Sequence, residues 1–279
     1  MFRSGCKFAA ASVLVCLACG CGRRGGEPIV LDTSGVVPAA DYTHLARVLA
    51  DVAMSDGFAD LYDLRKQSEA LEAQLRLLAV TGPTATPELL PAPEDALAYW
   101  YNARAAWSMK LLLIHGCPET VDADAYSHRP LPLDGRTMSL AQIDAELAKD
   151  ADFRVVACAP GATAVEAALP GEPLRADRLR ADLAGRLAAL IDDEQRFVVD
   201  IPRKQVRLPP SLWRVRGRII DAHHAAYGTE GATVTTALLP YVFGSPHRRL
   251  QDAIGFQCVE EAPRKLRAKA RKYRVQWEP

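Results

Sequence analysis

The chain is poor in cysteine beyond its first 21 residues, and its N-terminal apolar run is short. Four of its seven cysteines lie at positions 6, 16, 19 and 21. The other three (Cys117, Cys158 and Cys258) allow at most one disulfide and match no zinc-ligand spacing. The apolar run spans about eleven residues from Phe8, too few to cross a bilayer as a mature helix. A disulfide-stapled scaffold, a zinc finger and a membrane-spanning helix at the N-terminus are therefore excluded.

Excess charge and the common catalytic signatures are also missing. The 34 basic residues equal the 34 acidic ones, so overall charge does not favour nucleic acid as a partner. The chain contains no G-x-G-x-x-G, G-x-x-x-x-G-K-S/T, G-x-S-x-G or H-E-x-x-H motif. His223 and His224 with Asp221 could be considered for a metal. However, neighbouring helical residues point about 100° apart, so the two rings do not chelate one ion. We expect no cofactor, no metal and no nucleic acid.

The first 20 residues are typical of a signal peptide. Arg3 and Lys7 precede the apolar run, which ends in small residues and cysteines, L-A-C-G-C-G. This ending resembles a bacterial lipoprotein box, in which the cysteine after the cleavage site receives lipid. Cys21 fits that pattern better than Cys19, and an ordinary secretory signal is the alternative. Residues 21–40 are rich in Gly, Arg and Pro and are predicted to be a flexible tether.

The most strongly patterned segment runs from Glu94 to Gly116 and is predicted to be a helix. It is apolar nearly all round, which is typical of a helix buried in the middle of a domain. Trp100 and Trp107 lie on its apolar stripe and are interpreted as core packing, not as a ligand cage. Asn102 is a polar exception, so its buried amide is expected to tie the helix to a neighbouring loop.

The rest of the chain predicts further helices and a few strands. Helical periodicity or capping patterns are found at 41–53, 65–80, 139–147, 174–193, 211–227, 233–243 and 246–255. We predict a loop at residues 118–136, a strand at 152–159 and a hairpin at 196–208. The end of the sequence, 263–277, is predicted to be basic and β-like. The predicted fold is α+β: one mostly helical domain, 41–279, with a small antiparallel sheet around the buried central helix.

The order of three motifs resembles the uncharacterised family catalogued as domain of unknown function 547, over nearly all of the mature chain. The motifs, as they stand here, are Asp56-Gly57-Phe58-Ala59-Asp60-Leu61, Trp100-Tyr101-Asn102-Ala103-Arg104-Ala105-Ala106 and Gly135-Arg136-Thr137-Met138-Ser139-Leu140-Ala141-Gln142-Ile143-Asp144. The family's next block has a His, a Cys and an S-C-P. Here Asp152, Ala157 and Gly161-Ala162-Thr163 stand at those positions. The resemblance implies that this chain has lost most of any polar site in that block.

A thiol enzyme of the papain or transglutaminase type is the catalytic alternative. Such an enzyme needs a thiolate and a His that lowers its pKa. Cys158, at the end of the predicted strand, is the cysteine best placed for that role. The candidate bases are His128, His223, His224 and His247, none of which the sequence can bring to it. The competing interpretation of Cys158 is a core residue.

The C-terminal segment carries the clearest run of positive charge: Arg264, Lys265, Arg267, Lys269, Arg271, Lys272 and Arg274. It is either a solvated face or a contact for anionic lipid or an acidic partner. The first functional hypothesis is an exported, lipid-anchored envelope protein with a non-catalytic binding domain for a partner or ligand. The second is a thiol-dependent hydrolase or acyl transferase that uses Cys158.

Overall fold

The computed structural model describes residues 26–53, 59–116, 120–261, 265–267 and 270–271. Within them the chain forms the predicted α+β fold, dominated by helices. The helices are α1 (Thr43–Val52), α2 (Leu61–Lys66), α3 (Ser68–Val80), α4 (Pro93–Ile114), α5 (Ala123–His128), α6 (Leu140–Leu147), α7 (Phe153–Ala157), α8 (Leu179–Asp192), α9 (Pro210–Arg214), α10 (Arg216–Tyr227), α11 (Val234–Leu238) and α12 (Ser245–Asp252), with 3₁₀ turns at Pro87–Leu89 and Leu239–Tyr241.

The strands are short and form four small sheets. They are β1 (Ala59–Asp60), β2 (Thr120–Asp122), β3 (Leu131–Leu133), β4 (Arg136–Met138), β5 (Val198–Asp200), β6 (Gln205–Leu208), β7 (Gln257–Glu260), β8 (Lys265–Arg267) and β9 (Ala270–Arg271). The largest sheet has the order β5-β6-β7. Its β5–β6 hairpin is antiparallel, as predicted, but β7 joins β6 in parallel, so the sheet is mixed.

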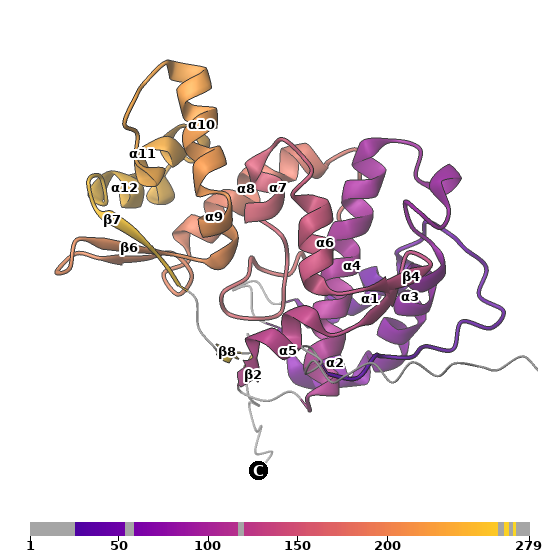
Figure 1. The fold of residues 1–279 in the computed structure, drawn as a ribbon. Helices are drawn as coiled ribbons and strands as arrows, with labels where there is room; N and C mark the ends of the chain where they lie inside the picture. Colours follow the sequence, from indigo (N-terminus) through magenta and orange to yellow (C-terminus); the bar gives the residue numbers. More distant parts are fainter. Residues whose placement is uncertain (1–25, 54–58, 117–119, 262–264, 268–269, 272–279) are drawn as a thin grey trace, which may run out of the picture.

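Helix α4 is the buried centre of the fold, close to the predicted boundaries (Figure 1). Pro93 occupies its first turn, and the Asp95 carboxylate accepts a hydrogen bond from the Ala92 amide at 3.0 Å. From Pro93 to Leu113 no β-branched residue interrupts the helix. It packs against α2 and α3 in the first part of the chain and against α6 further on. At 22 residues it is about 33 Å long, so it spans the domain.

The segment predicted as a strand at 152–159 is instead the short helix α7. The Asp152 carboxylate accepts a hydrogen bond from the Arg154 amide at 3.0 Å, which caps the helix, and the Cys158 amide bonds back to Arg154. Its core-facing residues are buried as completely as those of a central strand. A short apolar run of this kind does not distinguish helix from strand by periodicity, which explains the wrong prediction.

Residues 118–136 also contain more structure than the predicted loop. The antiparallel hairpin β3–β4 turns at Asp134 and Gly135, which both have positive φ (55° and 67°). Asp-Gly is the pair preferred for such a two-residue turn.

Part of the predicted tether lies on the domain. The Ile29 amide donates to the Pro130 carbonyl at 3.0 Å, and the Ala39 amide to the Thr81 hydroxyl at 3.0 Å. Ile29 and Leu31 pack against the core. Apolar side chains at these positions explain why the segment is held, despite a composition typical of a flexible linker.

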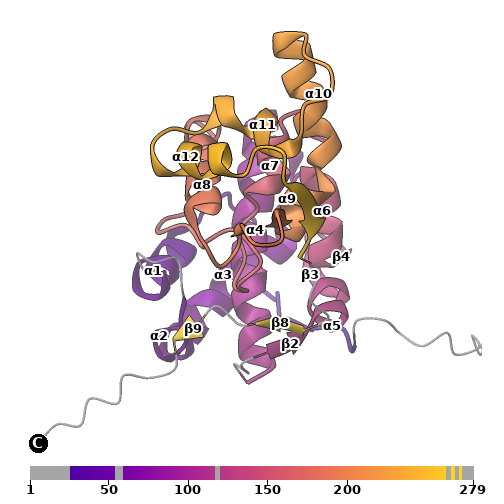
Figure 2. The same ribbon diagram turned by 90° about the vertical axis from the view of Figure 1, so that its left-hand side faces the viewer.

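The end of the chain returns to the first half of the molecule. Strand β8 pairs with β2 in antiparallel fashion (Figure 2). Strand β9 pairs with β1 in parallel. Helices α10 to α12 and the β5-β6-β7 sheet lie at the opposite end of the molecule from α1 and α3 (Figure 1). None of the helices in the described part of the chain is long and apolar enough to cross a membrane.

Candidate functional site

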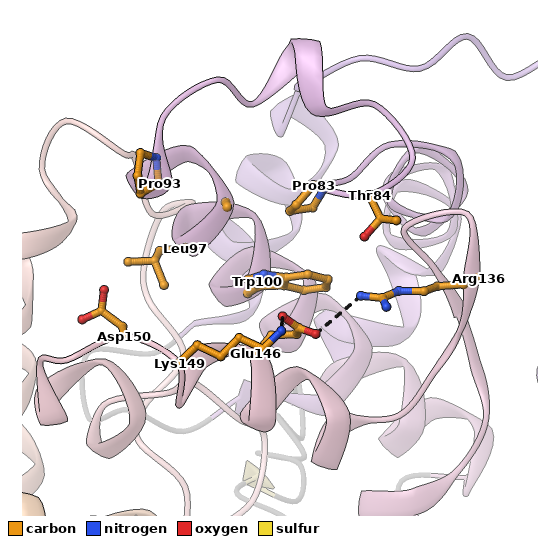
Figure 3. A pocket seen from close by; sticks show the side chains of 10 residues that line it. Pro83, Thr84, Pro93, Leu97, Trp100, Arg136, Glu146, Lys149 and Asp150 are labelled. Atoms are coloured by element: carbon orange, nitrogen blue, oxygen red, sulfur yellow. Dashed lines mark hydrogen bonds and ion pairs between the residues drawn. The ribbon is translucent and has the colours of Figure 1, made fainter.

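An open pocket of about 420 Å³ lies beside the first half of α4 (Figure 3). We call it the Trp100 pocket. Its lining residues are Pro83, Thr84, Pro93, Ala96, Leu97, Trp100, Arg136, Glu146, Lys149 and Asp150. They come from four places: the loop after α3, one face of α4, strand β4, and the end of α6 with the turn that follows.

The apolar wall comes mainly from α4. Pro93, Ala96, Leu97 and Trp100 follow one another at spacings of three, one and three residues, which places them on one face of the helix. Trp100 is 4% exposed and packs edge-on against Tyr99, with ring centroids 4.9 Å apart. The indole is thus held by the core while part of it lines the pocket.

A buried carboxylate positions the opposite wall. Asp134 lies in the β3–β4 turn, and its Oδ1 accepts hydrogen bonds from the amides of Thr84 at 2.7 Å and Ala85 at 2.8 Å. A Cβ at Gly82 would lie 2.3 Å from that oxygen, so glycine is required for this approach. Arg136, two residues after Asp134, contacts the same carboxylate at 3.3 Å. One side chain therefore fixes both the proline loop and the arginine of the rim.

The polar rim is held by ion pairs. The Glu146 carboxylate accepts from Lys149 Nζ at 2.6 Å and lies 3.6 Å from Arg136. Asp150 binds both terminal nitrogens of Arg180, at 2.8 and 2.6 Å. Hydrogen bonding from Arg180 holds the pKa of Asp150 below its ordinary value, so the carboxylate stays ionised at neutral pH. The rim thus presents donors and acceptors side by side (Figure 3).

The interpretation of the two tryptophans as core packing is confirmed for Trp107, which is fully buried. For Trp100 it is incomplete, because the same indole lines the pocket. Sequence periodicity places both tryptophans on one stripe of α4. It does not show that the residues packed over α4 cover Trp107 completely and leave part of Trp100 exposed to the pocket.

Asn102 binds a loop, as predicted. Its Nδ2 donates to the Leu174 carbonyl at 2.9 Å, and its Oδ1 accepts from the Leu174 amide at 2.8 Å. The side chain is fully buried, and the loop before α8 is thereby fixed to the middle of α4. Two bonds to one backbone unit satisfy that unit as a neighbouring strand would.

A buried ionic cluster on α4 was not predicted. Arg104 Nε donates to Asp144 Oδ1 at 2.6 Å, and its Nη1 lies 2.9 Å from Glu166 Oε1 and bonds to the Pro160 carbonyl. Glu166 Oε2 also accepts from Tyr126 at 3.0 Å and from Thr163 Oγ1 at 2.7 Å. An arginine inside an otherwise apolar helix was the available signal, because a buried guanidinium requires carboxylate partners.

This cluster overlaps the block in which the family resemblance places its polar residues. Thr163 and Gly161 hold Glu166: a Cβ at Gly161 would lie 2.1 Å from the Glu166 carboxyl carbon. Burial opposes ionisation of Asp144, but the charges of Arg104 and Arg214 outweigh it and hold the pKa of Asp144 below its usual value. The cluster is charge-balanced and internally paired, which is the arrangement of a structural ion-pair network.

Cys158 lies in the core. It is fully buried, and its Sγ donates to the Leu183 carbonyl at 3.8 Å. Burial raises the pKa of its thiol to about 12, and the charged groups that act on it are Arg186, Asp152 and Arg154. Thiol catalysis needs a depressed pKa and an adjacent His, so this environment favours the core interpretation over the enzyme interpretation.

Three of the four candidate histidines contact other groups, and the fourth, His247, is half-buried on α12. His128 pairs with Asp124 at 2.9 Å, His224 Nδ1 lies 3.1 Å from the Thr229 carbonyl, and the His223 ring packs on Tyr227 at 4.8 Å. No cluster of three or more His, Cys, Asp or Glu side chains suited to a metal occurs in the residues that the structure describes. Cys158 and Cys258 are free thiols.

Several predicted residues lie outside the described part of the chain. These are the lipid-site candidates Cys19 and Cys21, the cysteine Cys117, the motif residues Asp56, Gly57 and Phe58, and Arg264, Lys269, Lys272 and Arg274 of the basic segment. Of the basic C-terminal segment, Lys265, Arg267 and Arg271 belong to the short strands β8 and β9.

The chain was also compared with known proteins. No family model, no curated protein and no solved structure matches it. The resemblance to domain of unknown function 547 stays a prediction, and the geometry described above is the basis for assigning a function.

Proposed function

We propose that this protein is an exported, lipid-anchored cell-envelope protein whose domain binds a ligand in the Trp100 pocket and does not catalyse its conversion. The observation that carries the binding role is the pocket itself. Its indole is held by the core, and the Asp150 carboxylate is held by Arg180, so this part of the wall is pre-formed, whereas Lys149 on the rim is exposed.

The non-catalytic part of the proposal is supported by Cys158. The cysteine suggested for chemistry is fully buried, and burial raises its pKa. The pocket itself contains Arg, Lys, Glu and Asp, whose charges pair with one another or with Arg180. A general acid or base needs a pKa near the working pH, and Asp150 is shifted away from it.

The anchoring part rests on the sequence Leu17-Ala18-Cys19-Gly20-Cys21. We would express the full chain in a bacterial host fed an alkyne-labelled fatty acid and follow label and membrane fraction. Wild type and Cys19→Ser are expected to carry label and to sediment with membranes, whereas Cys21→Ser loses both. Label that follows Cys19, or a soluble wild-type protein without label, would contradict the assignment.

The binding part is tested by calorimetric titration of the purified full chain. The probes are small sugars, amino acids, inorganic phosphate and spermidine. At least one is expected to bind, and binding is expected to weaken when Trp100 is replaced by Phe. If none of these classes binds, the pocket is not a ligand site and the binding role is wrong.

A further inference from the structure

The Trp100 pocket has two halves of different chemistry. Pro83, Pro93, Leu97 and Trp100 form an apolar side, and Arg136, Glu146, Lys149 and Asp150 form a polar side. The volume of about 420 Å³ falls within the usual range of roughly 300 to 1,000 Å³ for small-molecule sites. A ligand that fills the pocket must therefore be apolar on one face and polar around its edge.

The side chains that line the polar side carry no net charge among themselves. Two cations, Arg136 and Lys149, are matched by two carboxylates, Glu146 and Asp150. The two carboxylates would repel an anionic ligand, and the arginine and the lysine would repel a cationic ligand. Either ion gains little from such a rim, because attraction and repulsion act at similar distances. The balance favours a neutral ligand.

The rim also offers donors and acceptors within one small area. Glu146 and Lys149 are 2.6 Å apart, and Arg136 lies 3.6 Å from the same carboxylate. A hydroxyl group donates one hydrogen bond and accepts two, so it can bind next to such a pair without breaking it. A purely apolar ligand would remove these charges from water without replacing their hydrogen bonds, which is unfavourable.

Pro83, Pro93, Leu97 and the small exposed part of the Trp100 indole supply the matching apolar contact. Trp100 combines a flat apolar ring with an N–H donor. None of the hydrogen bonds formed among the described residues involves its Nε1. The C–H face of a pyranose is flat and apolar, and its rim carries hydroxyls.

From these features, and resting on the proposed binding role, we infer that the Trp100 pocket binds a neutral carbohydrate. The sugar ring lies against the apolar wall formed by Trp100 and its neighbours. Its hydroxyls bond to the paired side chains of Arg136, Glu146 and Lys149. The sugar comes either from a soluble oligosaccharide or from the end of a polysaccharide chain, and the two sources share this chemistry.

The test uses the full chain in a detergent without a sugar headgroup. We would titrate it by calorimetry with the trisaccharides of glucose, N-acetylglucosamine, xylose and mannose, and incubate it with the corresponding insoluble polysaccharides. At least one trisaccharide is expected to bind. Its affinity is expected to change less than about twofold between low and high salt, because a neutral ligand is not screened. Retention only on polysaccharide would assign the polymer as the source.

Variants locate the binding. Trp100→Phe is expected to weaken binding at least about tenfold, whereas Trp107→Phe, on the same helix but fully buried, leaves affinity within about twofold. Because Trp100 also supports the core, Glu146→Gln at the rim is a second variant. It keeps the shape of the side chain and is expected to weaken binding at least about threefold.

Three results would overturn the inference: no sugar binds in either form, sugar binding is unchanged in both Trp100→Phe and Glu146→Gln, or binding is found only for phosphate or spermidine and falls with salt. The last result leaves the proposed binding role intact and replaces only the ligand class. Failure of every probe removes the binding role as well.

Discussion

At the scale of single residues, the two buried side chains Asn102 and Cys158 are the most informative. Asn102 satisfies one backbone unit of a distant loop, and Cys158 donates weakly to one carbonyl. Neither has access to solvent. Both are therefore expected to affect stability more than activity.

Replacing Asn102 by Ala should destabilise the domain by about 2 to 4 kcal/mol. Two hydrogen bonds are lost, and the Leu174 amide and carbonyl are left buried without a partner. Urea unfolding followed by circular dichroism measures the change. Gln251→Ala, at an exposed position of α12, is the control and should change stability by less than about 0.5 kcal/mol. An Asn102 variant as stable as wild type would show that water replaces the amide.

The thiol of Cys158 should resist alkylation in the folded protein. With a pKa of about 12, only about one thiol in ten thousand is ionised at pH 8. We would follow iodoacetamide labelling by mass spectrometry, with half-buried Cys258 as the internal comparison. Cys158 is expected to react only in denaturant. Fast labelling of Cys158 in the native protein would revive the thiol-enzyme alternative.

At this scale the sequence predicted Asn102 and Trp107 correctly because both follow from the period of one long helix. The sequence could not predict the partners of Arg104. Asp144 and Glu166 lie 40 and 62 residues away along the chain, and only the fold brings them together. The Trp100 pocket was missed for the same reason. Its rim residues Arg136, Glu146 and Lys149 have the composition of any solvated surface.

At the scale of elements, the Arg104 cluster connects α4 to α6 and to the loop after α7. Asp144 also accepts from Arg214 of α9 at 3.1 Å, so a fourth element joins. Ion pairs of this kind are costly to break from one side, because the remaining charge is buried alone. The elements around α4 are therefore coupled through charge as well as through apolar packing.

This coupling predicts acid sensitivity. The pKa of Asp144 is lower in the folded state than in the unfolded chain. The unfolded chain therefore takes up the proton first on acidification. The stabilisation is present above the unfolded pKa of about 3.9 and is lost as pH falls through the folded value.

Urea titrations between pH 7 and pH 3 measure that loss. Asp144→Asn should be less stable than wild type at pH 7 by roughly 3 to 5 kcal/mol, and the difference should shrink below about pH 4. Asp177→Asn, at an exposed ion pair with Arg175, is the control and should leave the transition nearly unchanged. A difference that is constant with pH would mean that Asp144 acts through packing and not through its charge.

The element boundaries show where sequence patterns suffice. The long helix α4 and the capped start of α6 at Ser139 were predicted well, and the end of α8 as well, although α8 begins at Leu179 and not at residue 174. The helix around Val155 was not predicted, because a buried apolar run of five residues is too short to show helical periodicity. The β3–β4 hairpin was missed although Asp134-Gly135 is a strong turn signal, because the flanking strands are only three residues long.

On the scale of the whole molecule, the C-terminal strands connect the two ends of the sequence. Val121 in β2 pairs with Leu266 in β8, and Ala59 in β1 pairs with Ala270 in β9. The sequence predicted a basic, β-like end, either a solvated face or a contact surface, and strands β8 and β9 lie in this segment. The backbone pairing was not foreseeable, since nothing in a basic segment specifies which strand it joins.

Deleting residues 262–279 should loosen β2 selectively. Hydrogen exchange of the amides at 120–122 is expected to accelerate at least about tenfold, because β2 loses its partner strand. The amides of β6 pair with β5 and β7, which are retained, and should exchange as in wild type. Mass spectrometry of the two peptides gives the comparison. Equal acceleration in both would indicate general unfolding, and no change in β2 would mean that β8 does not protect it.

The returning strands also set the order in which the protein can fold. Contacts between residues 59 and 270 close a loop of more than two hundred residues, and such distant contacts form late. During synthesis, β1 and β2 cannot pair with β9 and β8 until residues 265–271 have left the ribosome. In this protein that delay follows from the topology of its sheets.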